Sequence, residues 1–128
     1  MSKPPDTQTA RKKRAQKHGR WAEGLVRLYL MVRGHRILAA NYKTKVGEVD
    51  LIAKRGTVIS FVEVKARPTL TSAAEAVTFR QQSRIQRAAE HFLNHKPHLQ
   101  TCDVRFDVAL VTGVFRVDLL RDAWRPQR

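Results

Sequence analysis

Apolar and polar positions alternate with a period of two in several short segments of the chain, and apolar positions recur every three or four residues in two longer ones. The first pattern indicates β-strands and the second indicates amphipathic helices. The strand-like segments are 36–42, the two halves of 47–67, 103–111 and 114–120, and the helix-like segments are 21–32 and 73–94. The predicted order is therefore helix, three strands, helix, two strands (αβββαββ). Such an order implies an α/β fold whose mixed central sheet of about five strands is flanked by helices.

The centre of this pattern is the segment GEVDLIAKRGTVISFVEVKAR, residues 47–67. Strand-forming residues dominate both of its halves, and a turn at residues 54–56, which ends in glycine, is expected to join them into a hairpin. Alternate side chains of a strand point to the same face, so Phe61, Glu63 and Lys65 share one face of the second strand.

Acidic side chains lie in this hairpin at positions where a core strand should carry none. Asp50 and Glu48 share a face of the first strand, so Asp50 can converge with Glu63 and Lys65 at one end of the hairpin. Two carboxylates beside an ammonium group would form a hard-cation site with a neighbour that handles protons. The alternative is that Glu63 pairs with Lys65 on an exposed face while Asp50 pairs with an arginine such as Arg105.

Three further polar residues are candidates for supporting roles. Glu48 could ligate a metal directly, hold a water molecule, or pair with a lysine of the loop at residues 43–45. Arg105 and Asp107 share a strand face, so we expect them to pair with each other and to support the site structurally.

The two predicted helices each carry an apolar face. In segment 21–32 the apolar positions at helical spacing are Trp21, Leu25, Leu28, Tyr29 and Val32, with Ala22, Val26 and Leu30 widening the face. In segment 73–94 they are Ile85, Ala88, Ala89, Phe92 and Leu93. Both faces are expected to pack on the sheet. Glu23 is the only acid of the first helix, and its simplest role is an ion pair with Arg27.

The net charge of the chain favours some classes of binding partner over others. The chain of 128 residues has the length of one domain and carries 25 Lys and Arg against 11 Asp and Glu, a formal net charge of +14. This excess favours a polyanionic partner: nucleic acid first and an anionic membrane surface second, with mere tolerance of the charge as the alternative. No apolar run reaches membrane-spanning length. The lone Cys102 and the lack of an apolar leader favour a reducing, cytoplasmic setting.

The basic residues gather in a run near the start of the chain and on one face of the second helix. The candidates for phosphate contacts are Arg11, Lys12, Lys13, Arg14, Lys17, Arg20, Arg67, Arg80, Arg84 and Arg87. Residues 1–10 are polar and without periodicity, which predicts a disordered tail, and residues 126–128 are expected to fray. A mobile loop is expected at residues 66–72. Residues 11–125 then form a single domain.

Four motifs, taken in order, resemble those of the uncharacterised bacterial YraN-like family. They are Glu23, GEVD at residues 47–50, FVEVKAR at residues 61–67 and RFDVALV at residues 105–111. The resemblance covers about residues 19–120, and the combination is far more specific than any one motif. That family belongs to the restriction-endonuclease-like (PD-(D/E)xK) superfamily and is similar to archaeal Holliday-junction resolvases, so the resemblance implies a restriction-endonuclease-like core.

The resemblance also implies an active site. Its pattern is a helix Glu, a strand Asp and a Glu-x-Lys pair, which fall on Glu23, Asp50, Glu63 and Lys65. Asp50, Glu63 and the backbone carbonyl of Val64 would bind Mg²⁺ or Mn²⁺, with Glu23 reaching the ion directly or through water. Lys65 would orient the attacking water or stabilise charge on the phosphate. The chain departs from the family at Phe79 and Gln81, where such proteins usually show Pro and Lys, so Gln81 is only a candidate for support.

The implied function is that of a metal-dependent endonuclease acting on DNA, in preference to RNA, with branched recombination intermediates as the expected substrates. A homodimer would suit symmetric cleavage of a junction. Two alternatives stay open: a non-catalytic nucleic-acid-binding module that keeps the nuclease fold, and a protein-interaction domain, which leaves the acidic cluster unexplained.

Overall fold

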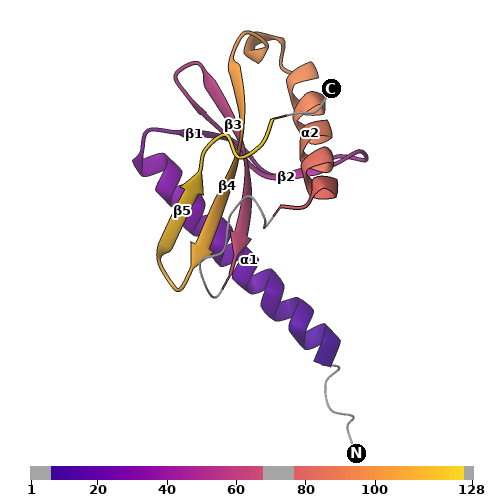
Figure 1. Ribbon diagram of the computed structural model, residues 1–128, viewed down its shortest axis with the longest axis vertical. Coiled ribbons are helices and arrows are strands. Elements are labelled where there is room, and N and C mark those ends of the chain that lie inside the picture. Colours follow the sequence, from indigo (N-terminus) through magenta and orange to yellow (C-terminus); the bar gives the residue numbers. More distant parts are fainter. Residues whose placement is uncertain (1–6, 68–76, 126–128) are drawn as a thin grey trace, which may run out of the picture.

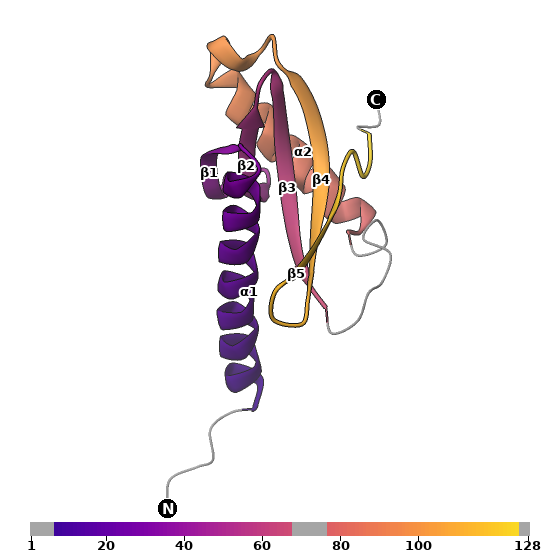
Figure 2. The same cartoon turned by 90° about the vertical axis from the view of Figure 1, so that its left-hand side faces the viewer.

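The computed structural model describes residues 7–67 and 77–125, which form a five-stranded mixed sheet with a helix on each face (Figures 1 and 2). The elements in chain order are α1 (Thr7–Val32), β1 (Arg36–Lys43), β2 (Glu48–Arg55), β3 (Val58–Ala66), α2 (Phe79–Asn94), a short 3-10 helix (Pro97–Leu99), β4 (Asp103–Thr112) and β5 (Arg116–Leu120). The predicted α/β fold and its αβββαββ order are confirmed.

The strands lie in sequence order across the sheet. All neighbouring pairs are antiparallel except β3 and β4, which are parallel. The parallel pair requires a crossover, and α2 lies within that connection. Alternation along the central strand β3 divides the core in two: Phe61 packs into the cluster beneath α2 and Val62 into the cluster beneath α1, and both are fully buried.

Helix α1 packs on the sheet through small and medium apolar side chains. Ala22, Val26 and Leu30, one turn apart, are fully buried. The prediction that Trp21, Leu28 and Val32 belong to this face was wrong, because they are 45%, 58% and 74% exposed. A single stripe at i, i+4 and i+8 suffices where the helix crosses the sheet closely. Among the described residues, no helix combines the length and the apolar character needed to cross a membrane.

Helix α1 also begins earlier than the sequence predicted. It starts at Thr7, so residues 7–10 are helical and not part of a disordered tail. Residues 1–6 and 126–128, for which disorder and fraying were predicted, lie outside the described part of the chain.

Helix α2 begins later than predicted and buries the predicted face. Ile85, Ala88, Ala89 and Phe92 are buried. The prediction of one continuous helix from residue 73 was wrong, since Thr78 has an extended backbone and caps a helix that begins at Phe79. Residues 73–76 lie outside the described part of the chain. The loop predicted at residues 66–72 falls mostly outside the described residues.

Glycines with positive φ make two of the three hairpin turns. Gly56 between β2 and β3 and Gly113 between β4 and β5 have φ values of 60° and 62°, a region that side chains with a Cβ rarely adopt. The predicted hairpin is confirmed, but its turn lies at Gly56 and Thr57, because Lys54 and Arg55, predicted to be in the turn, belong to β2. Beyond β5, Trp124 stacks on Phe106 with ring centroids 5.3 Å apart, which anchors the last described residues to the core.

Candidate active site

Asp50 lies where the regular pairing of β2 with β3 stops. The ladder runs from the Arg55–Val58 pair to the Leu51–Val62 pair. Beyond that point the Asp50 carboxylate accepts the backbone N–H of Val64 at 2.8 Å. A side-chain oxygen thus satisfies a strand N–H, and this bond fixes the carboxylate against β3.

The faces of β2 also change at this residue. Val49 packs in the cluster beneath α2, whereas Leu51, two positions on, packs in the cluster beneath α1. In a regular strand, residues two apart share a face. The break in alternation places Asp50 between the two faces of the sheet.

Two hollows meet at Asp50. The hollow on the α1 side has a volume of about 390 Å³ and is lined by Glu23, Lys43, Asp50 and Val64, among others. The hollow on the α2 side is smaller, about 60 Å³, and is lined by Glu48, Asp50, Glu63, Gln81 and Arg84, among others. The fold therefore gathers the predicted carboxylates around Asp50, with Glu23 on one side and Glu63 on the other.

The surroundings of Glu63 favour the protonated form of its carboxyl. Burial, the negative charge of Asp50 and a hydrogen bond with Asp50 raise the pKa of Glu63 from 4.5 to about 9. The Lys65 ammonium opposes this effect from 3.9 Å, between Nζ and Oε1, but does not cancel it. At neutral pH the Glu63 carboxyl is protonated, so it donates the hydrogen bond to Asp50.

The pKa of Glu23 is raised by the same two influences, burial and the charge of Asp50, to a smaller extent. Burial and then repulsion from Asp50 raise its pKa, while Arg27, a hydrogen bond with Asn41, and Lys43 lower it. Glu48 is exposed and adds a further repulsion that raises the pKa of Glu63. Negative charge is therefore crowded around Asp50, and a cation would relieve that crowding.

The oxygen donors at Asp50 suit a hard cation that takes only a few of its ligands from the protein. In the described part of the chain, no group of three or more His, Cys, Asp and Glu side chains is arranged to hold a metal ion. Asp50 and Glu63 form a pair, and the backbone of Val64 lies against Asp50. One or two carboxylates with several retained waters is the usual mode for Mg²⁺. A divalent cation would displace the proton from Glu63.

The comparisons with known proteins identify the family of this chain. The model of UPF0102, described as an uncharacterised protein family, matches residues 22–111. The chain belongs to this family. A UPF0102 protein of Paramagnetospirillum magneticum is 47% identical over 115 residues, which cover 87% of this chain and 89% of the relative. One of Parvibaculum lavamentivorans is 46% identical, with 88% and 84% covered, and one of Rhodopseudomonas palustris is 52% identical, with 70% of each covered.

Membership in UPF0102, the YraN-like family, confirms the resemblance read from the motifs, and the restriction-endonuclease-like placement is consistent with the fold. The matched residues contain Glu23, Asp50, Glu63 and Lys65. They exclude the cationic run at residues 11–20. What the family does chemically has to be argued from the site.

Gln81 lies at the site but has a structural partner. Its side-chain oxygen accepts the Thr78 N–H at 3.0 Å, and its own N–H donates to the Thr78 hydroxyl at 3.2 Å. This capping box begins α2 and turns the amide toward the helix end. Gln81 therefore supports the α2-side hollow by fixing the helix that lines it.

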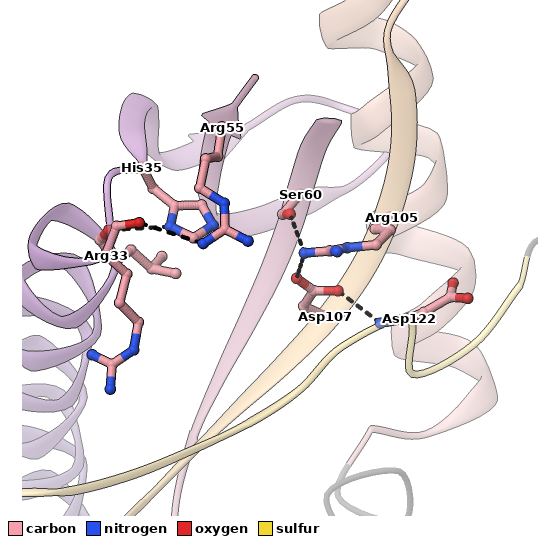
Figure 3. A network of polar contacts seen from close by, with 8 residues as sticks. Arg33, His35, Arg55, Ser60, Arg105, Asp107 and Asp122 are labelled. Atoms are coloured by element: carbon pink, nitrogen blue, oxygen red, sulfur yellow. Dashed lines mark hydrogen bonds and ion pairs between the residues drawn. The ribbon is translucent and has the colours of Figure 1, made fainter. Parts of the chain in front are cut away.

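Arg105 and Asp107 pair with each other, as predicted (Figure 3). Neither residue lines the two hollows at Asp50. Arg105 Nη2 donates to Asp107 and to the Ser60 hydroxyl, each at 3.3 Å. The buried Asp107 also accepts the N–H of Asp122 at 2.8 Å. The pair ties β4 to β3 and to the segment after β5, and Asp50 bonds to Val64 instead of Arg105.

The predicted phosphate-contact residues are divided among several places. Arg20 lines the α1-side hollow and Arg84 the α2-side hollow. Arg67 directly follows β3 and is exposed, as is Arg80 near the start of α2. Arg87 lines a separate hollow with Phe79 and Trp124. The side chains of Arg11, Lys12, Lys13, Arg14 and Lys17 lie outside the described part of the structure.

Sequence reasoning missed two residues that shape the site. Asn41 bonds to Glu23 and has a positive φ of 52°, a conformation that asparagine tolerates better than most residues. Gly47 abuts α2 so closely that a Cβ would overlap the backbone oxygen of Arg84. The only sequence signals were an asparagine within an apolar strand and a glycine before the first acid of the hairpin.

Proposed function

We propose that the chain is a metal-dependent endonuclease that hydrolyses phosphodiester bonds in DNA. The observation that carries the proposal is the protonated Glu63 held against Asp50, with Lys65 3.9 Å away. A proton retained between two carboxylates next to an ammonium is costly to stability, and such perturbed groups cluster at functional sites.

Asp50, Glu63 and the Val64 carbonyl would hold Mg²⁺ or Mn²⁺, since carboxylate and carbonyl oxygens suit these ions. The bound ion would supply Lewis-acid activation of the phosphate and of a water molecule. Glu63 would lose its proton as the ion binds, which makes ion affinity fall with falling pH.

The remaining residues have roles that follow from their positions. Asp50 keeps its orientation because the Val64 N–H holds one of its oxygens at 2.8 Å. Glu23 faces the larger hollow with Asp50 and can hold a water molecule there. Lys65 can orient the attacking water or stabilise charge on the phosphate, while Arg20 and Arg84 at the two hollows hold neighbouring phosphates.

A non-catalytic nucleic-acid-binding module is the second candidate. The observation that favours it is that the described residues contain no group of three His, Cys, Asp or Glu side chains arranged for a metal. In that case the Asp50–Glu63 hydrogen bond would serve only to join β2 and β3 beyond the end of their ladder, and the basic residues would hold nucleic acid without cutting it.

The test is cleavage of a labelled panel of single-stranded, duplex, flap and four-way-junction DNA, with RNA counterparts, in Mg²⁺ or Mn²⁺. Asp50→Asn and Lys65→Ala are each expected to reduce cleavage about 100-fold or more, the range of a lost acid–base or charge-stabilising group. Asp103→Asn, the same change at an exposed carboxylate that begins β4, is the matched control and should cleave like the wild type.

Binding completes the test. Asp50→Asn should abolish Ca²⁺ binding in calorimetry and leave DNA affinity unchanged or raised, because it removes a negative charge near the phosphate. Variant-sensitive cleavage establishes the enzyme and names its substrate. DNA binding without such cleavage, and without Ca²⁺ binding, would establish the non-catalytic module instead.

A further inference from the structure

Exposed aromatic and apolar side chains gather where the turn between β4 and β5 meets α1. Phe115 and Val114 of the turn are 74% and 61% exposed, and Trp21 of α1 is 45% exposed. The rings of Trp21 and Phe115 lie edge to face with centroids 6.0 Å apart. The Trp21 indole N–H donates to the Val114 carbonyl at 3.2 Å. The pair is therefore held in place by two contacts while a large part of each ring remains open to solvent.

This aromatic pair lies at the same end of the sheet as the carboxylates. Lys65 is aligned with Leu110 in the parallel β3–β4 ladder, and the Arg67 N–H donates to the Val111 carbonyl at 3.0 Å. The turn that carries Phe115 follows β4 directly, and both views show it beside α1 (Figures 1 and 2). Asp50 is two strands away from β4, about 10 Å at the usual strand spacing.

The surroundings of the pair select for a ligand that is both aromatic and anionic. Arg20 is adjacent to Trp21 in the chain, Arg67 lies at the neighbouring end of β3, and the whole chain carries a net charge of +14. Nucleotides offer an apolar π-face together with a phosphate. In a duplex those faces are already covered by neighbouring bases, so only unpaired nucleotides present them.

We infer that Trp21 and Phe115 form a stacking platform for unpaired nucleotides beside the candidate active site. This inference rests on the proposed function and narrows its substrate to DNA with a single-stranded part, such as a flap or an opened junction arm. The arginines would hold the backbone and the rings would hold one or two bases, without choice of sequence.

The test is equilibrium binding of a short oligothymidylate and of a blunt duplex of equal length, in EDTA so that no cleavage occurs. Phe115→Ala is expected to weaken oligothymidylate binding about 5-fold to 100-fold and duplex binding by less than about 2-fold, because stacking on an aromatic ring is available only to unpaired bases. Phe115→Leu keeps an apolar side chain without the ring and should weaken binding nearly as much.

Leu28→Ala is the matched control. Leu28 is 58% exposed and lies seven residues after Trp21, on the same side of α1 but two turns away from the β4–β5 turn. This variant should bind both ligands like the wild type. Because Phe115 is largely exposed, its truncation leaves no cavity in the core, and an unchanged far-UV circular dichroism spectrum verifies the fold.

Tryptophan fluorescence gives a second readout. Trp124→Phe leaves Trp21 as the sole tryptophan, and oligothymidylate should quench its emission while the duplex leaves it nearly unchanged. Equally weakened binding of both ligands by Phe115→Ala, or unchanged binding of both, would overturn the platform. So would a Trp21 emission shift with phosphatidylglycerol vesicles but not with oligothymidylate, or a dimer that Phe115→Ala dissociates without changing oligothymidylate binding.

The two proposals can fail separately. Phe115-dependent binding of oligothymidylate by a protein that cleaves nothing supports the platform and rejects the nuclease. Cleavage that depends on Asp50, with equal oligothymidylate affinity in the wild type and Phe115→Ala, supports the nuclease and rejects the platform.

Discussion

At the scale of the residue, Asp50 places a negative charge close to two other carboxyl groups, and a bound cation would offset that charge. Its carboxylate is fixed by the Val64 N–H, so it cannot turn away from Glu63. Its charge raises the pKa of both Glu63 and Glu23 from opposite sides of the sheet. The free energy of folding is therefore less favourable than a neutral side chain at position 63 would make it.

Glu63→Gln is predicted to stabilise the protein at alkaline pH when no divalent ion is present. The pKa of Glu63 is about 9 in the folded chain and near 4.5 when unfolded, so between these values only the unfolded state releases the proton. Wild-type stability therefore falls as pH rises from about 4.5 to 9, whereas glutamine has no proton to release. In EDTA the melting temperature of the variant should exceed that of the wild type by about 4 °C or more at pH 8, and by much less at pH 5.

Glu90→Gln, the same change at an exposed position of α2, serves as the control and should leave the melting temperature nearly unchanged at both pH values. A Glu63→Gln protein that is less stable than the wild type at pH 8, or whose advantage is the same at both pH values, would contradict the raised pKa of Glu63. Added Mg²⁺ should raise the melting temperature of the wild type more than that of Glu63→Gln.

The sequence predicted which residues come together at the site better than it predicted the packing around them. The alternation of β3 was enough to place Glu63 and Lys65 together, because strand geometry has a fixed period. The altered alternation at Asp50 and the contact of Gly47 with α2 arise from tertiary packing, which no local pattern encodes. The pairing of Arg105 with Asp107 was predictable from their spacing, but the hydrogen bond of Asp50 to the Val64 N–H was not.

At the scale of the element, a local signal marks the start of α2. Residues 73–77, AAEAV, have a high helix propensity, but the extended backbone of Thr78 excludes one continuous helix from residue 73, and α2 begins after Thr78. The motif TFRQ at residues 78–81 is a capping box, in which Thr78 and Gln81 satisfy each other's backbone N–H groups. This signal was in the sequence and was outweighed by the alanines. The face of α1 was harder to predict, since apolar residues lie on several of its sides.

Thr78→Ala is predicted to destabilise the protein by about 1 kcal/mol, because it removes the hydroxyl that accepts the Gln81 N–H. Urea denaturation should show a lower midpoint with an unchanged slope. Thr78→Ser retains the hydroxyl and should restore most of the stability, while Thr101→Ala, at an exposed position before β4, should cost less than about 0.5 kcal/mol. Equal stability of Thr78→Ala and the wild type would mean that the cap is not formed in solution.

At the scale of the whole molecule, the positive charge acts on a site that is itself acidic. The net charge of +14 attracts polyanions from a distance, while the carboxylates around Asp50 repel a phosphate at close range. Arg20 and Arg84 line the two hollows together with these carboxylates, so both the attraction and the repulsion act on a phosphate bound there. Binding of DNA should therefore be governed by the arginines and be opposed locally by the acids until a cation neutralises them.

This balance predicts a steep dependence of DNA affinity on salt, with a separable contribution from Arg84. Removing one cation that neutralises a phosphate should make the slope of log affinity against log salt concentration shallower by about 0.9 for duplex DNA. Arg84→Ala, which removes a cation from the α2-side hollow, should show this change in a fluorescence-anisotropy titration in EDTA. Arg121→Ala removes an exposed cation just after β5 and should leave the slope unchanged. A DNA affinity that hardly varies with salt would reject the electrostatic account. Equal effects of Arg84→Ala and Arg121→Ala on the slope would show that the total charge of the chain holds the DNA, and not the position of Arg84 at the site.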